Sequence, residues 1–197
     1  MTSGMSKAQR LIISSSIACL SAFAGVKVTN EAPAPKLVVY ADDAGSSPYV
    51  PSGWMGNQGA LALEANCTMN PHSGASCMKL EYRAADQWAG IIWQDPPSDW
   101  GDKPGGHDLT GAATLTFWAR GEAGSEKVKF VFGVIKREKP NFDTASGELN
   151  VVLTKEWTQY SIDLTGKDLG RIKTGFGWTV AGQGKPITFY LDDIKYE

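Results

Sequence analysis

The chain has 197 residues and a formal charge of −2. This length suits one domain with a proper core and is short for two. The 19 Lys and Arg residues are scattered among 21 Asp and Glu residues, so the sequence offers no basic field that would attract a phosphate backbone. Nucleic acid is therefore excluded as an expected partner.

The first 24 residues have the pattern of a secretory signal. Lys7 and Arg10 give a positive start, residues 11–24 are uncharged, and Ala22-Phe23-Ala24 places small residues before a cleavage point. The uncharged stretch is shorter than the ~20 residues needed to cross a membrane, so we expect no membrane span in the mature chain. Cys19 offers a lipoprotein anchor as the alternative, but the usual aliphatic residue three positions upstream is missing. We expect a signal peptide over residues 1–24, a spacer over residues 25–36, and a secreted or periplasmic mature protein.

Alternation with a period of two dominates the remainder of the chain, and helical periodicity is nearly absent. Gly and Pro clusters such as Pro104-Gly105-Gly106 separate the alternating segments. Many short strands between such turns predict an all-β fold, a jelly-roll β-sandwich of two antiparallel sheets, in one domain over residues 37–197. The clearest alternating segments are residues 61–65, 78–82, 128–134 and 160–164, and the longest expected loops are residues 41–59, 95–108 and 136–147.

Four segments together resemble a known family. An apolar strand runs into paired carboxylates at both ends of the expected domain, and two further segments carry aromatic strand motifs. They resemble strands of the β-jelly-roll carbohydrate-binding modules of the galactose-binding-domain-like superfamily. The resemblance implies a sugar-binding sandwich whose first and last strands lie side by side. The four segments are Leu37–Asp43, Leu115–Gly121 (LTFWARG), Glu156–Leu164 (EWTQYSIDL) and Pro186–Tyr196, which contains YLDDI.

The same resemblance implies a structural calcium ion between the terminal strands. It favours Asp192 as a ligand, together with Asp43 or its carbonyl oxygen. Calcium takes six to eight oxygen ligands, many of them backbone carbonyls, so one or two carboxylates suffice. Strand alternation would point Asp192 and Asp193 to opposite faces. The alternative is that these acids only protect the sheet edge against aggregation.

Cys67 and Cys77 flank a turn-rich loop of nine residues. Two cysteines in an exported chain, separated by so short a loop, predict a disulfide bond. Two alternatives stay open at this point, namely a pair of free thiols and a metal site that includes His72. The metal site would have at most three ligands, whereas zinc needs four in fixed geometry.

Tryptophans supply the candidate binding residues, because the apolar face of a sugar ring stacks on an indole. Trp118 and Arg120 share a strand face opposite the expected core residues around Phe117. Within residues 88–94, Trp88 and Trp93 must point to opposite faces. Trp88 has Gly90 and Gln94 on its face, which favours Trp88 for a ligand groove and Trp93 for the core.

Trp54 and Trp100 fall in expected long loops, each close to a glycine. An exposed loop tryptophan suggests ligand contact. Either ring would otherwise fold back over the core. The expected ligand-binding set is therefore Trp118, Arg120, Trp88, Trp54 and Trp100.

No catalytic constellation can be assembled from the sequence. His72 and His107 fall in unrelated loops, and no serine occupies a nucleophile elbow. We therefore expect a non-catalytic, exported protein that binds a poly- or oligosaccharide through an aromatic groove. A structural or adhesive protein with a protein partner is the alternative, followed by a polysaccharide-cleaving enzyme. An associated enzyme would be a natural partner for a binding module.

Overall fold

Strands make up nearly all the regular structure of the protein in this computed structural model, which describes residues 36–42 and 47–197. A three-residue 3-10 helix, Gln58–Ala60, is the helical segment of the described part. The strands are β1 (Leu37–Tyr40), β2 (Val50–Gly56), β3 (Leu61–Cys67), β4 (Cys77–Tyr82), β5 (Trp88–Gln94), β6 (Thr114–Gly121), β7 (Lys127–Phe132), β8 (Gly147–Val152), β9 (Thr158–Asp163), β10 (Thr174–Ala181) and β11 (Ile187–Tyr196).

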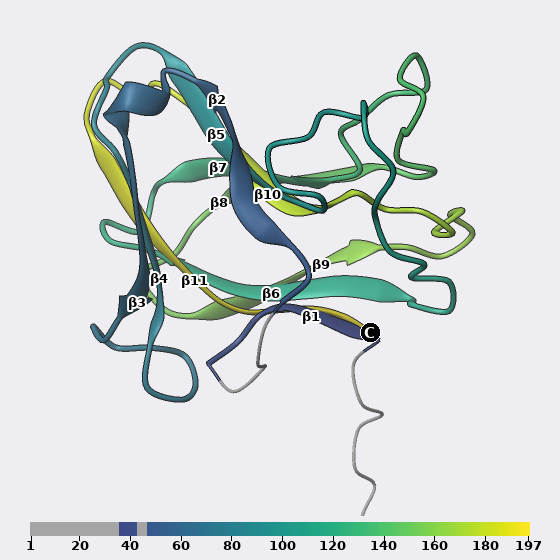
Figure 1. Ribbon diagram of the computed structural model, residues 1–197. Helices are drawn as coiled ribbons and strands as arrows, with labels where there is room; N and C mark the ends of the chain where they lie inside the picture. The colour runs from purple at the N-terminus through teal and green to yellow at the C-terminus, as the bar shows by residue number, and fades with distance from the viewer. Residues whose placement is uncertain (1–35, 43–46) are drawn as a thin grey trace, which may run out of the picture. The chain divides into compact units, whose positions relative to one another are not determined.

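Two antiparallel sheets lie face to face, as Figure 1 shows. Sheet A has the order β3-β4-β11-β6-β9, with β1 also paired to β11. Sheet B has the order β2-β5-β10-β7-β8. The expected all-β sandwich is confirmed. The terminal strands do lie side by side, since Leu37 of β1 is opposite Tyr196 of β11.

The core lies between the sheets and is built by alternation along the strands. Leu115, Phe117 and Ala119 of β6 are all fully buried. The ring of Phe117 contacts the rings of Phe130 in β7 and Phe176 in β10, with centroids 4.4 and 5.3 Å apart. The core-facing sides that were predicted from the sequence are thus confirmed for β6 and β7.

The expected loop over residues 41–59 is wrong in its second half, where the chain forms β2. Pro51 and Gly53 hid this strand, because both residues are depleted in strands. The proline is tolerated because β2 is an edge strand of sheet B, where its backbone need not donate a hydrogen bond to a further neighbour.

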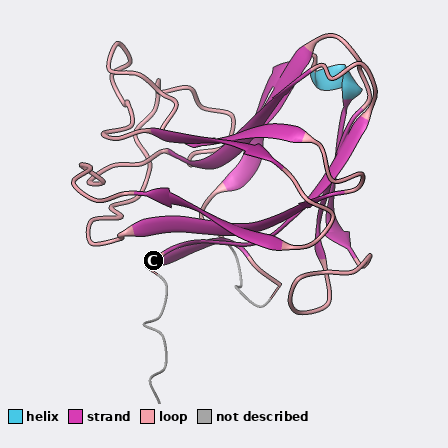
Figure 2. Ribbon diagram, turned by 180° about the vertical axis from the view of Figure 1, so that it is seen from behind, coloured by secondary structure: helices cyan, strands magenta, loops and turns pink. Residues whose placement is uncertain are grey.

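The long loops gather at one end of the sandwich, as Figure 2 shows. Backbone hydrogen bonds tie them to one another, from Asn141 N to Gly101 O (3.0 Å) and from Thr144 N to Arg171 O (2.9 Å). The other end carries tighter turns. No helix in the described part is long and apolar enough to span a membrane.

Candidate functional site: a groove on the outer face of sheet B

The outward side chains of sheet B follow from its register. Cross-strand partners share a face, and Thr179 of β10 lies opposite both Gly90 of β5 and Lys129 of β7. Lys129 in turn lies opposite Asn150 of β8. A second row contains Ala181, whose partner is Trp88. These polar and small residues face away from the core, because their strand neighbours are buried in it.

The loops cover one end of this outer face. Gln94 is 1% exposed, and its Nε2 donates to the carbonyl oxygen of Asp99 in the β5–β6 loop (2.9 Å). Ile92 is fully buried on the same side, and a Cβ at Gly177 would lie only 2.3 Å from its Cδ1. The outer face is therefore closed at the loop end and available to a ligand at the end that carries Trp88 and Ala181.

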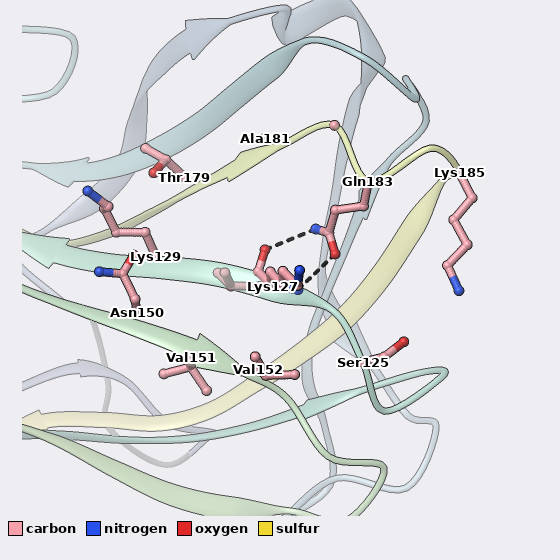
Figure 3. Close-up of a pocket in the computed structure, with 12 residues that line it drawn as sticks. Ser125, Lys127, Lys129, Asn150, Val151, Val152, Thr179, Ala181, Gln183 and Lys185 are labelled. Carbon is pink, nitrogen blue, oxygen red and sulfur yellow. Dashed lines mark hydrogen bonds between the residues drawn. The ribbon is translucent and has the colours of Figure 1, made fainter.

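A groove of about 640 Å³ lies at the open end, between β7, β8, β10 and the β10–β11 turn (Figure 3). Three lysines reach it from two different elements. Hydroxyl and amide groups add further donors and acceptors, and valines supply apolar surface. The lining residues are Ser125, Lys127, Val128, Lys129, Asn150, Val151, Val152, Thr179, Ala181, Gly182, Gln183 and Lys185.

The side chain of Gln183 completes one wall of the groove. Pairing between β10 and β7 ends at Thr179 and Lys129, so the main chain of Lys127 has no partner in β10. Lys127 N donates to Gln183 Oε1 (2.9 Å), and Gln183 Nε2 donates to Lys127 O (3.0 Å). Figure 3 shows this pair of hydrogen bonds. The amide thus bridges the place where the two strands separate.

Trp88 stands on the same face, opposite Ala181 in the groove lining. Trp88 is 52% exposed, whereas Trp93 of the same strand is 2% exposed and belongs to the core. The prediction that Trp93 packs in the core and Trp88 points away from it is confirmed. The predicted role of Trp88 in ligand binding stays a prediction. An exposed indole beside a polar groove has the geometry for stacking on a sugar ring.

Trp118 and Arg120 lie elsewhere, on the outer face of sheet A, so they cannot share a groove with Trp88. His72 from the β3–β4 loop stacks on Trp118, with centroids 3.7 Å apart. The Arg120 guanidinium lies 3.7 Å from the centroid of Tyr190, and its Nη2 donates to Met69 O (3.1 Å). Strand alternation correctly predicted that Trp118 and Arg120 point away from the core. It could not predict that the loop of residues 68–76 packs onto them.

The two loop tryptophans do not line the groove either. Trp54 is in strand β2 rather than in a loop, and it lies opposite the core residue Ile91, at the edge of sheet B. Trp100 is partly buried in the β5–β6 loop. Its neighbour Asp99 is held in a buried ion pair with Lys173, which places Trp100 at the loop end of the sandwich.

The paired acids within β11, Asp192 and Asp193, hold the same β3–β4 loop. Asp192 is 1% exposed, and its carboxylate accepts hydrogen bonds from the backbone N–H groups of His72 (3.0 Å), Ser73 (3.3 Å) and Asp193 (2.9 Å). Asp193 accepts from His72 Nδ1 (2.8 Å). The two carboxylates do not point to opposite faces as expected, because β11 has a register shift here and Asp193 adopts a φ of 46°.

The backbone N–H groups that donate to Asp192 affect whether this carboxylate can also bind the expected calcium ion. A cation at Asp192 would compete with three N–H groups that already supply positive charge to the carboxylate. Asp43, the second expected ligand, lies outside the described residues. No cluster of three or more His, Cys, Asp or Glu side chains suited to a metal occurs among residues 36–42 and 47–197. Calcium at Asp192 stays a prediction.

Cys67 and Cys77 lie directly opposite each other at the end of the β3–β4 pair. Both side chains are buried, and both are free thiols in this structure. Burial is the main cause that raises the pKa of Cys77 to about 12, and the charge of the neighbouring Cys67 thiolate is the second cause. The disulfide therefore stays a prediction, and the register places the two residues where it would form.

Sequence reasoning missed the groove lysines and Gln183. Alternation around Val128 and Phe130 does place Lys127 and Lys129 on the outer face. An outward lysine is the usual state of a lysine, however, so the pattern carried no functional signal. The contribution of Gln183 depends on a turn that returns to β7 from 56 residues away, and no local pattern reports such a contact.

Comparison with known proteins agrees with this architecture. The profile of the family described as "Carbohydrate binding domain 30" matches residues 36–197. The family 30 carbohydrate-binding module of the cellulosomal cellulase Cel9D-Cel44B of Clostridium thermocellum superposes with a TM-score of 0.58 at 18% identity, over 82% of this chain and 96% of that chain.

A family 11 carbohydrate-binding module from Clostridium thermocellum, solved with a β-1,3-1,4-mixed-linked tetrasaccharide, gives a TM-score of 0.56 at 13% identity, over 81% of this chain and 94% of that one. No curated protein sequence matches the chain. At these identities the solved structures establish the shared sandwich fold. The profile match covers most of the chain, and the chain therefore belongs to the carbohydrate binding domain 30 family.

Proposed function

We propose that the protein binds a poly- or oligosaccharide along the groove on the outer face of sheet B, with Trp88 as the stacking surface at its margin. The observation that carries this proposal is the groove of about 640 Å³ beside a tryptophan that is 52% exposed, in a member of a carbohydrate-binding family. Asn150, Thr179 and Gln183 supply the hydrogen-bonding groups that sugar hydroxyls require.

The proposal is for binding without cleavage. Glycoside hydrolysis generally uses two carboxyl groups that flank the scissile bond. Among the described residues that line the groove, none is Asp or Glu. The bound sugar would therefore meet donors, acceptors and apolar surface, but no pair of groups positioned to protonate and attack the glycosidic bond.

Trp88→Ala tests the proposal. Removing an exposed stacking ring should reduce glycan affinity by about 1–3 kcal/mol, as an interface aromatic does, while the melting temperature changes little because the ring is outside the core. Affinity should be measured by calorimetry on a panel of soluble glycans that includes mixed-linked β-1,3-1,4-glucan, the linkage type in the family 11 complex, and acidic polysaccharides.

Trp118→Ala is the matched control, since it removes the same side chain from the other sheet. This variant should lose stability, because His72 stacks on the ring, yet keep its glycan affinity. Loss of affinity in Trp118→Ala with full affinity in Trp88→Ala would move the site to sheet A. No binding to any glycan by the wild-type protein would contradict the proposed function itself.

A further inference from the structure

We propose that the ligand of the sheet B groove is an anionic polysaccharide, whose carboxylate or sulfate groups contact Lys127, Lys129 and Lys185. This inference rests on the proposed function and specifies its ligand class. The groove contains three lysines among its lining residues and, within the described part, no acidic one. The chain as a whole carries a formal charge of −2, so the groove differs in sign from the molecule around it.

The lysines are arranged along the groove rather than around one point. Lys127 and Lys129 are two residues apart in β7 and both point to its outer face. Their Cα atoms are therefore about 7 Å apart. Lys185 approaches from the β10–β11 turn, as Figure 3 shows. Gln183 fixes the relation between strand and turn through its two hydrogen bonds to the main chain of Lys127. Separated cations along a groove can each contact one negative group of a polysaccharide that carries such groups at intervals.

The electrostatic balance favours an anion over a neutral sugar. Lys127 and Lys185 are exposed, and no carboxylate among the described residues lies within ion-pair distance of either. Lys129 does pair with Glu148 across the strands, with Nζ and Oε2 3.2 Å apart. A neutral glucan laid over these amines would remove water from charges without replacing it by opposite charge. An anionic chain would supply that charge.

The aromatic content of the groove points the same way. Among the described residues in its lining, none is aromatic, and Trp88 stands only at the margin. A neutral chain that depends on stacking would therefore find one platform, whereas an anionic chain would find one platform and three cations. Glu148 would oppose the anion, and this makes it the most informative residue to change.

The experiment compares four probes by calorimetry at low and high NaCl: polygalacturonate, a sulfated galactan, mixed-linked β-glucan and poly-glutamate. We expect at least one of the two anionic polysaccharides to bind about tenfold or more tightly than the neutral glucan at low salt, and to weaken as salt screens the charges. The carboxylated and sulfated arms distinguish the source of the negative charge. Poly-glutamate controls for simple ion exchange.

Variants at the groove make the test specific. Lys127→Gln and Lys185→Gln should each weaken anionic binding by roughly 3- to 10-fold, and Glu148→Gln should strengthen it by roughly 2- to 3-fold because Lys129 is released. Lys79→Gln on the other sheet makes the same change in net charge and should have no effect.

Four results would overturn the inference. Neutral glucan that binds as tightly as the polyanions would leave the proposed function intact and refute the charged ligand. Equal binding to poly-glutamate, or equal losses from Lys79→Gln and Lys127→Gln, would reduce the effect to net charge. If no polysaccharide binds, the proposed function fails and this inference fails with it.

Discussion

At the scale of single residues, Glu126 shows how one carboxylate can fix the turn that borders the groove. Glu126 is 3% exposed and accepts hydrogen bonds from the backbone N–H groups of Ala123 (2.6 Å), Gly124 (3.0 Å) and Ser125 (2.9 Å). A Cβ at Gly121 would lie 1.8 Å from Glu126 Oε2. The glycine that ends the LTFWARG motif is therefore required by the carboxylate that folds against it.

Glu126→Gln should destabilise the protein by about 1–3 kcal/mol at neutral pH, since the amide can accept on one side only. Burial opposes ionisation of Glu126, but the amides of Ala123 and Ser125 outweigh it and lower its pKa below the ordinary 4.5. A lowered pKa adds stability above pH 4.5 that is lost as the pH falls through the folded value. Urea unfolding at several pH values should show the deficit shrinking in acid. A pH-independent deficit, or an equal deficit in the exposed control Glu138→Gln, would contradict this account.

The sequence predicts correctly which way a side chain points where strand alternation decides its orientation. It does not predict whether that side chain is exposed where a loop decides what covers it. The opposite orientations of Trp88 and Trp93, and the outward side of Trp118, follow from a period of two. What covers an outward residue depends on loop conformation. His72 covers Trp118, whereas Trp88 remains exposed.

At the scale of elements, the β3–β4 pair and its loop form a unit that a disulfide would close. Cys67 and Cys77 face each other in register, and the raised pKa of Cys77 makes its thiolate scarce in the folded state, so oxidation should accompany folding. Protein exported through its own leader should contain no free thiol when unfolded without reductant, and its mass should lack residues 1–24. Two titratable thiols in that material would refute the disulfide, and an intact leader would refute export.

Asp192 in β11 is the residue at which the calcium prediction can be tested. If an ion binds Asp192, a chelator should lower the melting temperature and excess calcium should restore it, because a ligand of the native state stabilises that state. Asp192→Ala should abolish the response, whereas Asp163→Ala, an exposed acid on β9, should keep it. A melting temperature indifferent to chelator and calcium would mean that the three amides alone balance this carboxylate.

At the scale of the whole molecule, the two ends of the sandwich differ in structure, because one carries the groove and the other the long loops. The alternating segments and four strand motifs were enough to predict two antiparallel sheets and the pairing of the terminal strands. The groove could not be predicted in this way, because it arises where β10 and β7 separate and where Gln183 crosses between them. At the opposite end, a buried ion pair between Lys173 and Asp99 holds the long loops.

That ion pair supplies the last prediction. The side chains of Lys173 and Asp99 are 1% and 3% exposed. Burial opposes ionisation of Asp99, but the Lys173 ammonium and the amides of Gly101 and Lys103 lower its pKa. Lys173→Met would leave the carboxylate buried without its cation, which should cost about 3–5 kcal/mol of stability. The double variant Lys173→Met/Asp99→Asn should recover part of this loss, since no charge is then left unpaired. Urea unfolding measures the stability of both variants.

The glycan affinity of both variants should equal that of the wild-type protein, because the ion pair lies at the end remote from the groove. Calorimetry at a temperature where each variant is folded measures this affinity. A selective loss of affinity in folded Lys173→Met would show that the loop end takes part in binding.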